Sequence, residues 1–151
     1  MDWTRPETPT DENPLVMYFI VRQSLGMGAG KVGAQCAHAC QLILIQEKKI
    51  NKLISLKFPN DLQISKSIDI CKNISLRMNY WNDCNINGSF RKVVLRSNEK
   101  EWEAIKKSYN PIIVIDAGLT EVEPNTETVM VLWPMFKNER CKILKRLQTL
   151  K

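Results

Sequence analysis

The chain has 151 residues, of which 44% are hydrophobic and 25% are charged, and this length suits a single domain with a buried core. No apolar stretch is long enough to span a membrane, and the acidic, proline-bearing start does not resemble a signal peptide. Five cysteines without a C-x-x-C pair argue against a zinc site or a disulfide framework. We therefore expect a cytoplasmic protein with reduced thiols and no contact with a membrane.

The net charge of +6 is unevenly distributed along the chain. Residues 1–14 sum to −3, so residues 15–151 carry +9. We expect residues 1–14, which include three prolines, to form a disordered acidic tail, and residues 15–151 to form the domain. A basic domain suits an anionic partner such as nucleic acid, and a solvated lysine-rich surface without a partner is the alternative.

The first half of the chain predicts one strand followed by helices. The continuous apolar run Leu15–Arg22 is typical of a buried central strand. Apolar and small residues at helical spacing predict a helix over 31–47, continued over 48–56. Phe58-Pro59-Asn60 interrupts it, and a second helix is expected over 62–81 with Asp61 as a candidate N-cap.

The second half predicts three more strands and two helices. The strands are Lys92–Arg96, Ile112–Ile115 and Val129–Trp133, and the helices are 98–108, capped by Ser97, and 137–150. The loop before the last strand contains no helix, which favours an antiparallel return. This order of elements predicts an α/β fold, a three-layer α/β/α sandwich around a mixed four-stranded sheet.

A glycine-rich turn, Gly26-Met27-Gly28-Ala29-Gly30-Lys31, joins the first strand to the first helix. Backbone N–H groups and the dipole at a helix N-terminus can hold an anion there, either a phosphate or a developing oxyanion. The lysine is followed by Val32 rather than Ser or Thr, and the glycine spacing is not that of a Walker A loop. The turn therefore does not predict a nucleoside triphosphatase.

Polar side chains lie on one face of the helix that follows this turn. Lys31, Gln35 and His38 are spaced i, i+4 and i+7, close to the strand ends where open α/β sheets bind ligands. The alternative interpretation is structural: a helix-start lysine is usually solvated, and a lone histidine among alanines is more often packed than catalytic.

A second polar group follows the third predicted strand. Asp116 and Thr120 lie in the sequence Asp-Ala-Gly-Leu-Thr, and Thr128 follows eight residues later. A carboxylate can orient a water molecule there, and hydroxyls can position that water or a carbonyl oxygen. An Asp-Gly turn with threonines chosen for β propensity is the alternative.

Three separated segments then carry a resemblance: GMGAGKVGAQCAHAC after the strand FIVR, W-x6-G-x3-K-V-V-L from Trp81 to Leu95, and DAGLTEVEPNTETVMVL from Asp116. Their order and spacing resemble the type II peptidyl-tRNA hydrolase family over residues 15–46 and 81–151. The resemblance implies a compact α/β fold, often a homodimer. It also implies hydrolysis of the ester joining a peptide to the 3′ end of tRNA, with no metal or organic cofactor.

The resemblance also implies roles for single residues. Catalytic roles fall on Lys31, His38, Asp116, Thr120 and Thr128, and contacts with the tRNA fall on Gly28, Gly30, Lys31 and Gln35, with packing or hydrogen bonding as the alternative role of Gln35. Asp116 and a threonine hydroxyl would orient the attacking water, while Lys31 and the helix N-terminus stabilise the oxyanion or the terminal phosphate. His38 is either the base or a group behind the reacting atoms.

Three positions depart from the family's usual pattern. Leu119 and Glu121 replace a basic residue and a glutamine beside the motif threonine, and Trp133 replaces a glycine. Residues 47–80 also form a longer and more basic segment than most members carry, which is either a tRNA contact or a solvated helix. These departures support a second hypothesis, a non-catalytic paralogue that binds tRNA or a protein partner through the same fold.

Overall fold

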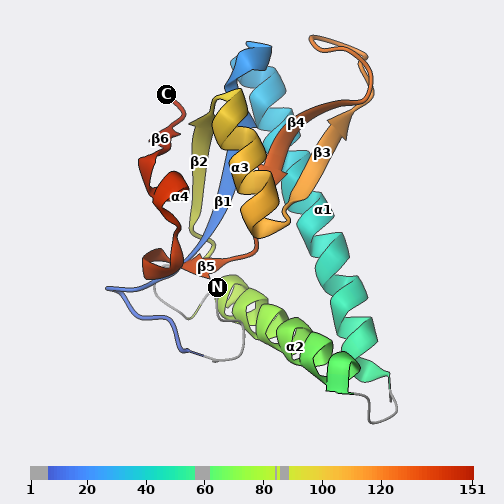
Figure 1. The fold of residues 1–151 in the computed structure, drawn as a ribbon, viewed down its shortest axis with the longest axis vertical. Helices are drawn as coiled ribbons and strands as arrows, with labels where there is room; N and C mark the ends of the chain where they lie inside the picture. The colour runs from blue at the N-terminus through green and yellow to red at the C-terminus, as the bar shows by residue number, and fades with distance from the viewer. Residues whose placement is uncertain (1–6, 57–61, 84, 86–88) are drawn as a thin grey trace.

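The protein is described by a computed structural model over residues 7–56, 62–83, 85 and 89–151. Six strands form one mixed sheet: β1 Leu15–Arg22, β2 Lys92–Ser97, β3 Ile112–Asp116, β4 Thr126–Val131, β5 Met135–Phe136 and β6 Gln148–Thr149. The helices are α1 Ala29–Ser55, α2 Leu62–Asn82, α3 Glu99–Tyr109 and α4 Lys142–Arg146, with short 3₁₀ turns at Gln23–Leu25 and Lys137–Glu139. The predicted α/β class is confirmed (Figure 1).

The sheet order is β3-β4-β1-β2-β6, and β5 pairs with the start of β1. β1 and β2 are parallel, whereas β4 runs antiparallel to both β1 and β3, as the loop before it predicts. The sheet has six strands rather than four because β6 adds an edge strand beside β2 and β5 pairs with the start of the central strand β1. Each has two residues, too few to show a period in the sequence.

β1 is buried on both faces, which explains its unbroken apolar sequence. One face packs under α1 and α2, in a cluster that includes Leu15, Met17, Phe19, Val21, Val32, Ala39, Ile43, Met78 and Trp81. The other face packs on α3 and the C-terminal segment, in a cluster that includes Val16, Tyr18, Ile20, Trp102, Ile105 and Leu144. The two clusters place helices on both sides of the sheet, as the three-layer prediction requires.

The two long helices agree with the sequence patterns. The segments predicted over 31–47 and 48–56 form one continuous helix, α1, which begins at Ala29. Its C-terminal half projects beyond the sheet, and α2 begins near that far end and runs back toward the sheet at an angle to α1 (Figure 1). The predicted break at Phe58-Pro59-Asn60 and the candidate cap Asp61 lie outside the described residues.

The predicted helix over 137–150 is wrong. The segment instead forms a 3₁₀ turn, the short helix α4 and the strand β6. Leu144 and Leu147 are buried, but Leu150 is exposed and its N–H donates to the carbonyl of Val94. The outer edge of β2 carries unpaired backbone groups, and the end of the chain pairs with them instead of continuing as a helix.

The last long strand is displaced from its predicted bounds. β4 starts at Thr126 and ends at Val131, whereas the sequence predicts Val129–Trp133. The antiparallel ladder with β3 reaches the pair Asp116 and Thr126, so Thr126 and Glu127 join the strand despite their polarity. Trp133, half-buried, packs against the core after the strand has ended.

The remaining observations concern the tail and the cysteines. Residues 1–6 of the expected tail lie outside the described residues, and residues 7–13 contain no helix or strand. Cys36, Cys40, Cys71 and Cys141 are free thiols, while Cys84 lies outside the described residues. Within the described ranges, no helix combines the length and apolar character needed to cross a membrane.

The N-cap of α3 is Asn98 rather than the predicted Ser97. Asn98 Oδ1 accepts from Glu101 N at 2.9 Å, and Glu101 Oε2 accepts from Asn98 N at 2.9 Å, so the two residues form a complete capping box. Ser97 is the last residue of β2 and is buried, with its hydroxyl facing the carbonyl of Val21.

We predict that Asn98→Ala lowers the free energy of unfolding by about 1 kcal/mol, because the backbone N–H of Glu101 loses its side-chain acceptor. For a domain of this size the melting temperature then falls by roughly 3 °C. Asn98→Asp keeps the cap and serves as the matched control. A loss of similar size in both variants would contradict the assignment of the cap to Asn98.

Candidate active site

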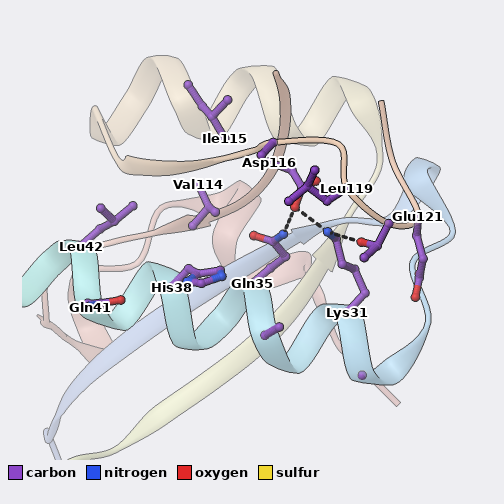
Figure 2. Close-up of a pocket in the computed structure, with 14 residues that line it drawn as sticks. Lys31, Gln35, His38, Gln41, Leu42, Val114, Ile115, Asp116, Leu119 and Glu121 are labelled. Atoms are coloured by element: carbon purple, nitrogen blue, oxygen red, sulfur yellow. Dashed lines mark hydrogen bonds and ion pairs between the residues drawn. The ribbon is translucent and has the colours of Figure 1, made fainter. Parts of the chain in front are cut away.

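A cleft of about 760 Å³ lies between the N-terminal half of α1 and the end of β3. One wall consists of residues from Gly30 to Leu42 of α1, and the other consists of residues from Val114 to Glu121. Figure 2 shows that side chains from both walls point into the space between them. The two polar groups singled out in the sequence therefore face each other across one cleft.

Asp116 is held at the end of β3 by a tight turn. Asn125 N donates to the Asp116 carbonyl at 2.8 Å, and Gly118 N donates to Asp116 Oδ1 at 2.7 Å. Gly118 has a φ of 76°, and a Cβ at this position would lie 2.4 Å from Pro124 N. Only glycine fits this turn without strain, so the residue fixes the direction of the Asp116 carboxylate.

Lys31 and Gln35 reach Asp116 from successive turns of α1. Lys31 Nζ lies 2.5 Å from Asp116 Oδ2 and 2.7 Å from Thr120 Oγ1. Gln35 Nε2 donates to the same Asp116 oxygen. Residues at i and i+4 share one face of a helix, which explains why both side chains converge on a single carboxylate (Figure 2).

The resulting ion pair is largely removed from solvent. Asp116 is 8% exposed, and the Lys31 side chain is 11% exposed. Hydrogen bonds from the Lys31 ammonium and the Gly118 N–H hold the pKa of the Asp116 carboxyl below its ordinary value of 3.8. Asp116 is therefore a carboxylate throughout the neutral range, with the Lys31 ammonium shared between it and Thr120.

Two of the other predicted catalytic residues lie apart from this cluster. His38 is exposed at the rim of the cleft, one turn beyond Gln35, and it makes no hydrogen bond with the described residues. Thr128 is fully buried in β4, and its hydroxyl faces the Val114 carbonyl at 3.4 Å. The structure thus brings together Lys31, Gln35, Asp116 and Thr120, places His38 beside them, and leaves Thr128 in the sheet.

The glycine turn binds the carboxylate of Glu121, a side chain of the same protein. Gly28 is the N-cap of α1, and its N–H donates to Glu121 Oε2 at 2.7 Å. Gly30, two residues further along, lines the cleft. The contact with Glu121 joins residues 93 apart in the sequence, and its sequence signal is the replacement of the family glutamine by an acid at this position.

The far end of the cleft is apolar. Leu42, Val114 and Ile115 line it together with Ala34, and Leu119 lies at its mouth. Ile115 and Leu119 are 62% and 87% exposed. The cleft therefore has a charged end around Lys31 and Asp116 and an apolar end suited to a carbon chain.

The described residues contain no group of three or more His, Cys, Asp or Glu side chains arranged to hold a metal ion. The polar groups that meet at Asp116 are one ammonium, one carboxylate, one hydroxyl and one amide, supplied by Lys31, Asp116, Thr120 and Gln35. His38, Gln41 and Glu121 also line the cleft. The set at Asp116 can orient a water molecule and stabilise a negative charge that develops on a substrate oxygen.

The lowered pKa of Asp116 predicts a pH-dependent contribution to stability. Because the carboxylate is favoured in the folded state, this contribution is complete above the ordinary pKa of 3.8 and is lost as the pH falls through the folded value. The difference in melting temperature between the native chain and Asp116→Asn should therefore be constant from roughly pH 5 to 7. This difference should become smaller as the pH falls below 3.8. A difference that stays unchanged into acid would contradict this prediction.

Comparison with known proteins agrees with this geometry. The family model described as Peptidyl-tRNA hydrolase PTH2 matches residues 15–150. A peptidyl-tRNA hydrolase of Thermoplasma acidophilum is 31% identical over 133 residues, covering 84% of this chain and 91% of that protein. One from Methanococcus vannielii is 29% identical and covers 87% and 96%, and a probable peptidyl-tRNA hydrolase 2 of Drosophila melanogaster is 27% identical and covers 78% and 52%. The chain belongs to the PTH2 family of peptidyl-tRNA hydrolases.

Proposed function

We propose that this protein hydrolyses the ester bond of peptidyl-tRNA, releasing a peptide and a free tRNA. One observation carries the proposal: Lys31, Asp116 and Thr120 converge in a cleft of a chain that belongs to this family. The cleft is open to solvent along one side and has both a charged and an apolar end, which suits a substrate with a phosphate-rich part and a peptide part.

Asp116 positions the attacking water in this proposal. Its Oδ2 accepts from Lys31 and Gln35, and its Oδ1 accepts from Gly118 N, so one lone pair of Oδ1 is left for a water O–H. The water oxygen attacks the ester carbon while its proton moves toward Asp116. The C–O bond to the ribose then breaks, the ribose oxygen takes the proton, and the products are a peptide carboxylic acid and a tRNA 3′-hydroxyl.

Lys31 and Thr120 stabilise the charge that develops on the ester oxygen. The Thr120 oxygen accepts from Lys31 Nζ, so the Thr120 O–H remains available to donate into the cleft. An ammonium and a hydroxyl fixed by the fold need little reorganisation when the oxyanion forms. His38, at the rim, is placed to contact the substrate or to exchange a proton with solvent.

The tRNA is held by charge in this proposal. Residues 15–151 carry +9, and phosphates of the acceptor end would meet Lys31 and the turn that contains Gly28 and Gly30. Such binding weakens steeply with salt, because phosphate contacts release bound counterions. We further propose a homodimer, from the family resemblance alone, and a cytoplasmic location, from the cysteine usage of the sequence.

A second candidate function rests on Glu121. Its carboxylate accepts the hydrogen bond from Gly28 N–H, which is expected to bind a phosphate or an oxyanion of the substrate. Leu119, in the same loop, supplies no positive charge. A chain with its anion site filled by its own side chain would bind tRNA or a protein partner without turnover. This alternative predicts binding that is unaffected by loss of Asp116.

The hydrolase proposal predicts that the protein releases the acyl group of N-acetyl-leucyl-tRNA. Lys31→Met and Asp116→Asn should each lower kcat/KM by roughly 10²- to 10³-fold, since each removes a charge aligned with the transition state. Lys107→Met, an exposed substitution on α3 across the sheet, is the matched control. Turnover no faster than in the two variants, combined with salt-sensitive tRNA binding, would favour the second candidate.

The Glu121 contact predicts that Glu121→Gln improves substrate binding. The glutamine oxygen can still accept from Gly28 N, but one negative charge facing the tRNA is removed. We expect KM to fall roughly two- to five-fold at low salt, and less at high salt because of screening. Glu123→Gln, an exposed carboxylate of the same loop, should have a smaller effect. An unchanged or higher KM for Glu121→Gln would contradict this account.

A further inference from the structure

Gln35 has a buried oxygen that the cluster does not use. The residue is 2% exposed, and its Nε2 is the atom that faces Asp116, because an ionised carboxylate can only accept hydrogen bonds. Its Oε1 therefore points away from Asp116. This oxygen exposes less than 1 Å² and has no hydrogen-bond partner among the described residues. A buried acceptor without a donor is costly, so the position favours a ligand that brings a donor.

The free oxygen faces the apolar end of the cleft. Figure 2 shows Gln35 with its amide nitrogen directed to Asp116 and its oxygen directed to the side where His38 and Val114 lie, away from Lys31. Leu42 and Ile115 line the cleft beyond them. His38 and Gln41 also line this end, but the one lysine in the lining, Lys31, lies at the other end. The end therefore suits a peptide, which offers both N–H donors and carbon side chains, better than a phosphate.

We propose that Gln35 recognises the peptide part of the substrate, with its Oε1 accepting a hydrogen bond from the α-amide N–H of the amino acid that carries the ester. This inference rests on the proposed hydrolase function. It assigns the contact to the acyl side of the scissile bond, whereas the tRNA lies at the charged end. The side chain of the same amino acid would then contact the apolar wall formed by Leu42 and Ile115.

The spacing of the two amide atoms supports this assignment. In Gln35, one carbon separates the nitrogen that contacts Asp116 from the free oxygen. In the substrate, one carbon separates the ester carbon from the α-amide nitrogen. Gln35 Nε2 contacts Oδ2 of the same carboxylate whose Oδ1 holds the water. An ester carbon beside this carboxylate therefore lies next to Gln35, and the α-amide N–H is the nearest donor that the substrate can offer to Oε1. The Gln35 side chain would thus orient the Asp116 carboxylate through its nitrogen and position the esterified amino acid through its oxygen.

The oxygen is covered in the structure, so the substrate has to displace a part of the cleft. The segment from Ala117 to Asn125 contains no helix or strand and is held over α1 by the contacts of Thr120 with Lys31 and of Glu121 with Gly28. The other wall is a packed helix. A shift of this loop is the smaller rearrangement, and it opens the floor on which Gln35 lies.

The test compares two substrates that differ in one atom. N-acetyl-leucyl-tRNA has an α-amide N–H, and O-acetyl-2-hydroxy-4-methylpentanoyl-tRNA has an ester oxygen at the same place, which cannot donate. We expect the native chain to prefer the amide by roughly ten- to 100-fold in kcat/KM. In the oxygen analogue, Gln35 Oε1 receives no hydrogen bond and faces a lone pair of the ester oxygen instead.

Variants distinguish recognition from a general loss of activity. Gln35→Met removes the acceptor and should bring the preference close to one, while Thr120→Val lowers both rates and keeps the preference. If Gln35→Met does not fold, Gln35→Asn, whose oxygen is one carbon short, takes its place. Equal rates for the two substrates with the native chain, or a full preference retained without Gln35 Oε1, would overturn the inference. Hydrolysis of neither substrate by the native chain would instead overturn the proposed function.

Discussion

The Asp116 carboxylate accepts hydrogen bonds from a lysine, a glutamine and a backbone N–H, and these donors belong to two segments of the chain. Lys31 and Asp116 are 85 residues apart in sequence. A carboxylate this buried is tolerated only where its charge is compensated, so the end of β3 and the first turns of α1 have to approach each other. The walls of the cleft follow from that requirement.

The packing of the sheet keeps this ion pair in place. α1 is anchored on β1 by Val32, Ala39 and Ile43, and β3 is fixed by its ladder with β4. Because β1 is buried on both faces, α1 and β3 cannot shift without disturbing the core. Lys31 and Asp116, which these two elements carry, are therefore aligned before a substrate arrives, which is the condition under which fixed charges lower a barrier most effectively. The loop that carries Thr120 and Glu121 is the less constrained part.

The long elements and the polar cluster could be predicted from the sequence, because they depend on local patterns. Helical spacing alone puts Lys31 and Gln35 on one face, and Asp116 follows an apolar strand. The contact between Gly28 and Glu121 could not be predicted, since it joins two loops through one hydrogen bond. The strand at the C-terminus could not be predicted for a related reason: the leucines of this segment have helical spacing, but the free edge of β2 determines its structure. The burial of Thr128 in the sheet could not be predicted either, because β4 begins at Thr126 and not at Val129, where the apolar run begins.

The central claim is that Lys31 and Asp116 act as one unit in the reaction. A double-mutant cycle measures this most directly, with kcat/KM for N-acetyl-leucyl-tRNA determined in Lys31→Met, Asp116→Asn and the double variant. If the pair acts as a unit, the double variant should be about as slow as the slower single variant. If the two residues act independently, their effects on the activation free energy should add, and that result would contradict the account.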